Sequence, residues 1–143
     1  MTGQIFVDGR WREGGDDAFA SIDPSTGDTV WEGRSASMDD AAQAVAAARR
    51  AFTDWSRRPR QERIDAVKRY QAVLNARADD FARAISCETG KPLWETRQEL
   101  ASMQGRVDIS IRAYAERTGE LDGPTAFGRA VLRHKPHGVA AVL

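Results

Sequence analysis

Short apolar stretches separated by turn residues predict two small β-hairpins near the amino terminus. The pair Asp8-Gly9 lies between two such stretches within residues 4–12, and Asp-Gly favours a type I′ turn because glycine accepts a positive φ without a Cβ clash. A second pair of extended segments, within residues 18–33, flanks a turn with Pro24 and Gly27. The chain therefore begins with two hairpins.

Apolar residues then recur at three- and four-residue intervals, which predicts an α-helix. Ser37 can cap its start, with Asp39 and Asp40 placed in the positive first turn. Pro59 ends this helix near Arg58 and can open the next one. The helix carries one apolar stripe, which consists of Ala41, Val45, Ala48, Phe52 and Trp55.

Three more helices follow. The second repeats apolar residues from Ile64 to Leu74. The third begins near Asp79 and stops at Gly90, with Pro92 beyond, which is a strong stop signal. The fourth spans residues 93–117, with Gly119 closing it. Its apolar stripe consists of Leu100, Met103, Val107, Ile111 and Tyr114.

The chain becomes extended again after residue 120. Residues 129–135 predict an exposed strand and residues 136–138 a turn. Residues 139–143 form a short continuous apolar run, typical of a buried parallel strand. Such a strand needs neighbours and a covering helix, which this sequence does not supply. The pattern therefore predicts an α+β fragment of an α/β fold, truncated at the first strand of a parallel, Rossmann-like sheet.

Composition excludes several functional classes. Of 143 residues, 21 are basic and 21 acidic, so no net positive field favours nucleic acid or anionic membranes. One cysteine allows no internal disulfide, and two histidines are too few for a common zinc site, so no metal is expected. No signal peptide or bilayer-length apolar run is visible, which indicates a soluble cytoplasmic protein.

Individual chemical candidates are better explained as structural residues. Cys87 lies inside a helix before acidic Glu88, an environment opposite to that of a reactive thiolate. His134 and His137 are flanked by cations that would repel a metal. A basic cluster of four arginines is diluted by acids and predicts a solvated helix junction; its members are Arg57, Arg58, Arg60 and Arg63.

No phosphate-binding glycine loop or nucleophile elbow is present, so residue patterns alone reach no reaction. They leave two main hypotheses, a fragment of an enzyme and a free-standing helical interaction module. A nucleic-acid-binding helical domain is a third, which the zero net charge disfavours.

Six motifs in order resemble the start of the aldehyde dehydrogenase superfamily. They are the hairpin Val7–Trp11, the turn Asp23–Asp28 (with Asp23 where Asn is usual), Ala51–Trp55, Arg63, the intact Glu-Thr-Gly-Lys-Pro of Glu88–Pro92, and Pro136–Val139. Within it, three stretches resemble the subfamily that oxidises N-succinylglutamate 5-semialdehyde in arginine catabolism: Ile109–Tyr114, Arg117–Glu120 and Leu132–Val139.

The resemblance implies that residues 1–143 are the amino-terminal part of the cofactor-binding domain of an NAD-dependent enzyme. The nucleophile, the general base and the nicotinamide loops of the family all lie downstream, so this chain holds no catalytic or cofactor-binding residue and is expected to be inactive and to bind no NAD. Residues 124–138 resemble an arm used in homo-oligomer contacts. The fourth helix lies near the substrate entrance in relatives, which makes Met103 and Arg106 the candidates for lining a substrate channel.

Overall fold

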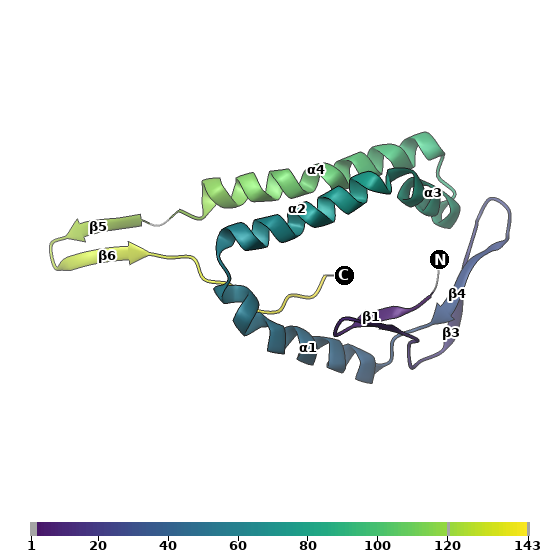
Figure 1. Ribbon diagram of the computed structural model, residues 1–143, viewed down its shortest axis with the longest axis horizontal. Coiled ribbons are helices and arrows are strands. Elements are labelled where there is room, and N and C mark those ends of the chain that lie inside the picture. The colour runs from purple at the N-terminus through teal and green to yellow at the C-terminus, as the bar shows by residue number, and fades with distance from the viewer. Residues whose placement is uncertain (1–2, 120, 143) are drawn as a thin grey trace.

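A computed structural model describes residues 3–119 and 121–142 (Figure 1). Within these residues, four successive helices are preceded by two antiparallel hairpins and followed by a third. The elements are β1 (Ile5–Val7), β2 (Arg10–Arg12), β3 (Ala18–Ile22), β4 (Thr29–Arg34), α1 (Met38–Arg57), α2 (Arg60–Ala76), α3 (Ala78–Thr89), α4 (Leu93–Arg117), β5 (Leu121–Thr125) and β6 (Gly128–Leu132). The predicted hairpins and helices are confirmed.

The turn of the first hairpin has the predicted geometry. Asp8 has φ 51° and Gly9 φ 79°, so both central residues are left-handed, as a type I′ turn requires. The turn sets the register in which Phe6 lies opposite Trp11, and the two rings are 5.0 Å apart between centroids. Local turn chemistry therefore defines this hairpin without help from a larger sheet.

Helix ends also follow the sequence signals. Ser37 caps α1, and its side chain exchanges hydrogen bonds with Asp40 in a capping box. α3 ends at Gly90, whose φ of 71° is left-handed. A Cβ on Gly90 would lie 2.8 Å from Cγ of Pro24, so the turn of the second hairpin packs closely against this helix end.

The helices form an open arrangement rather than a closed bundle. α2 and α4 run side by side with α3 packed against one end, while α1 lies apart on the hairpin side and β5–β6 projects away from the helices (Figure 1). Among the described residues, the buried apolar side chains are two alanines and two leucines: Ala47, Leu74, Ala82 and Leu100. None of the described helices is long and apolar enough to span a bilayer.

One detail of the sequence-based prediction is wrong. Residues 139–142 form no strand, and Val142 is 95% exposed, because no neighbouring strand offers hydrogen-bond partners; Leu143 lies outside the described residues. On α1, Ala41, Val45 and Ala48 of the apolar stripe are exposed, so most of this stripe has no partner among the described residues. β1 contacts α1, and Ala47 is the buried apolar residue of this helix.

Candidate functional site

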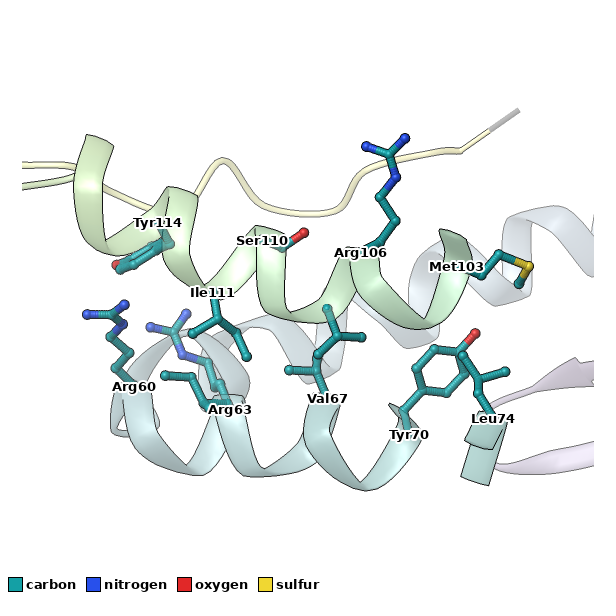
Figure 2. Close-up of a pocket in the computed structure, with 12 residues that line it drawn as sticks. Arg60, Arg63, Val67, Tyr70, Leu74, Met103, Arg106, Ser110, Ile111 and Tyr114 are labelled. Carbon is teal, nitrogen blue, oxygen red and sulfur yellow. The ribbon is translucent and has the colours of Figure 1, made fainter. Parts of the chain in front are cut away.

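A groove of about 540 Å³ lies between α2 and α4 (Figure 2). Apolar residues of the two helices face each other along the groove. Of these residues only Leu74 is buried, so the others leave the groove open. The lining residues are Arg60, Arg63, Ile64, Val67, Tyr70, Leu74, Met103, Arg106, Val107, Ser110, Ile111 and Tyr114. The groove is thus an apolar trough with several polar side chains.

A polar network fixes the spacing of the two helices. The Gln71 amide donates to the Gln104 carbonyl oxygen and to the Asp108 carboxylate, both at 2.8 Å. Lys68 also pairs with Asp108, and its hydrogen bond, followed by that of Gln71, holds the pKa of this carboxyl below its usual value. Because the network ties side chain to side chain and to backbone, the groove walls are held in place.

The charged residues that line the groove are all positive. Three arginines line it, and no aspartate or glutamate does. The Arg60 guanidinium lies over the Tyr114 ring, 4.5 Å from its centroid, a cation–π contact. Neither Arg63 nor Arg106 has a carboxylate within ion-pair distance among the described residues. The groove therefore carries positive charge that the described part of the chain does not neutralise.

Arg63 differs from the other two arginines. Its Nε is buried and has no hydrogen-bond partner in the described residues. Figure 2 shows Arg60 and Arg63 rising from α2 toward α4, whereas Arg106 extends from α4 away from α2. Buried donors are nearly always paired in proteins, so the Arg63 Nε is an exception among the described residues.

The structure brings both predicted channel candidates to this groove. Met103 and Arg106 line it together, and Met103 is 44% exposed. Their role in substrate passage stays a prediction. Sequence reasoning missed Arg63 as a groove residue because it appeared as one member of a basic cluster, and no sequence signal separates a solvated arginine from one folded against a neighbouring helix.

The other sequence candidates do not come together. Cys87 is exposed on α3, and His134 and His137 are exposed after β6. No group of three or more potential metal ligands occurs among the described residues. Within the basic cluster, Arg58 pairs with Glu62 while Arg60 stacks on Tyr114, so its members have separate surroundings.

Comparison with known proteins identifies the family of this chain. The sequence profile of the aldehyde dehydrogenase family matches residues 11–143. The chain belongs to this family. It is 57% identical over all 143 residues to N-succinylglutamate 5-semialdehyde dehydrogenase 2 of Caulobacter vibrioides, and covers 30% of that relative. The chain thus spans about 30% of the length of the curated relatives it matches.

Solved structures of this family share the fold. Succinate-semialdehyde dehydrogenase of Burkholderia pseudomallei matches 86% of the chain with a TM-score of 0.76 and 28% identity, and 26% of that structure is covered. Betaine aldehyde dehydrogenase of Staphylococcus aureus, solved in complex with NAD+, matches 86% with a TM-score of 0.75 and 23% identity, and the chain covers 25% of it. The open helical arrangement is therefore that of one part of a larger enzyme fold.

Proposed function

We propose that this chain is the amino-terminal part of the cofactor-binding domain of an NAD-dependent semialdehyde dehydrogenase, with N-succinylglutamate 5-semialdehyde as the substrate. The observation that supports the proposal most is 57% identity across the whole chain to a relative named for that substrate. Dehydrogenases named for benzaldehyde, betaine aldehyde and succinate semialdehyde share the fold, so the fold supports the reaction class and the sequence identity supports the substrate.

In such an enzyme, NAD accepts the hydride of the aldehyde carbon. The residues of this chain do not fit NAD themselves, because no glycine-rich loop offers backbone N–H groups to a pyrophosphate. In this proposal the helices of the chain form a layer beside the reaction centre. We assign to it the wall of the substrate entrance, with Met103 giving an apolar contact and Arg106 attracting the carboxylates of the semialdehyde.

A chimera tests the proposal. Residues 1–143 of this chain are joined to the remaining part of the Caulobacter vibrioides relative, in place of its own matching segment. The chimera is expected to form NADH from N-succinylglutamate 5-semialdehyde, whereas the 143-residue chain alone is expected to form none. A chimera that folds with the melting behaviour of the relative but oxidises no semialdehyde would contradict the proposal.

Arg106 has its own test in this chimera. Arg106→Ala is expected to raise KM for the dicarboxylic semialdehyde by about tenfold, because a long-range attraction is lost, while kcat changes little. An uncharged aldehyde such as hexanal serves as the comparison and should show no rise. If KM rises equally for both aldehydes, the residue acts through packing rather than charge.

The projecting hairpin fits a role in assembly. The main contacts of β5 and β6 are with each other, and Phe127 at their turn is fully exposed. An extended arm with an exposed aromatic residue and a free strand edge is suited to pairing with another subunit. We therefore propose residues 124–138 as an oligomerisation arm. A free-standing interaction module is the alternative, and an inactive but well-folded chimera would favour it.

A further inference from the structure

The side chain of Arg106, which the proposed function places at the substrate entrance, is not fixed by an ion pair. It is exposed, and no carboxylate among the described residues lies within ion-pair distance of it. Figure 2 shows it extending from α4 away from α2. The place of its guanidinium therefore depends on the backbone of α4 and on how that helix is held.

Side chains of α2 hold α4 from its other face. Because an α-helix turns by about 100° per residue, Gln104 and Asp108 lie on one face of α4, and Arg106, midway between them, lies on the opposite face. The Gln71 amide of α2 donates to the Gln104 carbonyl oxygen and to the Asp108 carboxylate, both at 2.8 Å. One side chain of α2 thus bonds α4 two residues before Arg106 and two residues after it.

The bond to the Gln104 carbonyl oxygen acts on the backbone of α4. A carbonyl oxygen has two lone pairs, so it can accept from Gln71 in addition to the N–H group of its own helix. The oxygen has no rotamer to change, so this bond limits the rotation and sliding of the helix itself. In return, the Gln104 amide donates to the Leu74 carbonyl oxygen of α2 at 3.5 Å, which joins the two backbones at the same place.

We propose that Gln71 is a positioning residue, which holds α4 so that the Arg106 guanidinium meets a carboxylate of the substrate. The inference rests on the proposed function for the role of Arg106, and it deepens that role by making Arg106 a direct contact. A guanidinium and a carboxylate form two parallel N–H···O bonds only in a narrow range of orientations. Because the arginine side chain is long, a small rotation of α4 would move its end by about 1 Å or more, which is enough to weaken such a pair.

The chimera with the remaining part of the Caulobacter vibrioides relative provides the test. Gln71→Met keeps the size of the side chain and removes its hydrogen bonds. It is expected to raise KM for N-succinylglutamate 5-semialdehyde by about threefold or more, while kcat and the KM for hexanal change little. Gln61→Met is the matched control, because the Gln61 amide bonds Asp65 within α2 and does not reach α4. It should leave both KM values unchanged.

A double-mutant cycle shows whether Gln71 acts through Arg106. In the Arg106→Ala background, Gln71→Met should raise KM no further, because no guanidinium is left to position. Thermal melts verify that each variant is folded; if Gln71→Met is not, Gln71→Asn replaces it, since its shorter side chain cannot reach α4.

Three results would overturn the proposal: Gln71→Met raises KM equally with and without Arg106, raises it equally for hexanal, or does not raise it. If Arg106→Ala raises KM for the semialdehyde in the last case, the proposed function stands and only this inference fails. A folded chimera that oxidises no semialdehyde would contradict both.

Discussion

Asp40→Ala is expected to lower the midpoint of thermal unfolding by on the order of ten degrees, because several hydrogen-bond donors lose one buried acceptor together. The Asp40 side chain is 5% exposed. Its Oδ2 accepts from the Gly15 amide at 2.8 Å and from both the amide and the hydroxyl of Ser37 at 2.9 Å. Its Oδ1 pairs with Arg12 at 2.7 Å. One carboxylate thus joins the first hairpin, the segment after it and the start of α1.

The same contacts predict a pH dependence. Hydrogen bonds from the Ser37 and Gly15 amides, followed by the Ser37 hydroxyl, lower the pKa of Asp40 below its usual value of 3.8. The unfolded chain therefore binds the proton at a higher pH than the folded chain. The stabilisation by Asp40 is complete well above pH 3.8 and is lost as the pH falls through the lowered pKa of the folded state.

Asp39→Asn provides the control, because Asp39 is the neighbouring exposed acid of the same first turn and, among the described residues, its side chain bonds only that of Gln43. In thermal melts at pH 7, Asp39→Asn should have a small effect and Asp40→Asn should melt at a clearly lower temperature. Between pH 4 and 2, Asp40→Asn should also lack the part of the stability loss that comes from protonation of Asp40, whereas Asp39→Asn should keep it. If both variants melt alike at pH 7, Asp40 does not join the elements as its contacts indicate.

The sequence predicted what is encoded locally. The Asp8-Gly9 turn, the Ser37 cap, the Pro59 boundary and the Gly90 stop each depend on a few adjacent residues, and the structure confirms all four. The long-range bond from Gly15 to Asp40 spans 25 positions and leaves no periodic trace in the sequence. Asp40 was therefore predicted only as an acid suited to a helix amino terminus.

The error at the carboxyl end arose because the apolar pattern was taken to imply a neighbouring strand. Residues 139–142 have the composition of a strand, but a strand forms only when a neighbour accepts its hydrogen bonds. Val45 on α1 has helical periodicity, which shows that one side of the helix is apolar but not which element covers it. For the candidate site, periodicity placed Met103 on the right face of α4. It did not show that Arg63 lies in the same groove, because that depends on how α2 packs on α4.

Two exposed apolar surfaces lead to the last prediction, that the 143-residue chain self-associates or behaves as a partly ordered globule. The first surface is the outer face of α1, hollowed over about 460 Å³, and it consists of Met38, Ala41, Ala42, Val45, Ala46 and Arg49. The second is the groove between α2 and α4. Contiguous apolar surface of this kind is uncommon on monomers and drives association.

Size-exclusion chromatography with light scattering, together with a dye that fluoresces on apolar surface, measures this directly. The chain is expected to elute as a mixture of species and to bind the dye, and the double variant Val45→Lys with Val67→Lys should reduce dye fluorescence by about twofold or more, because it places a charge on each surface. Val73→Lys is the matched control, since Val73 is 53% exposed and belongs to neither surface.

The chimera with the remaining part of the Caulobacter vibrioides relative separates the two explanations of dye binding. If α1 and the groove are faces that pack against the rest of an aldehyde dehydrogenase, the chimera should bind far less dye per molecule than the chain alone, although it is the larger protein. A chain that is by itself a monodisperse monomer, melts sharply and binds no dye would show that Ala47, Leu74, Ala82 and Leu100 form a sufficient core. Such a result would favour the free-standing interaction module over the enzyme segment, because a self-sufficient fold needs no further sheet to cover it.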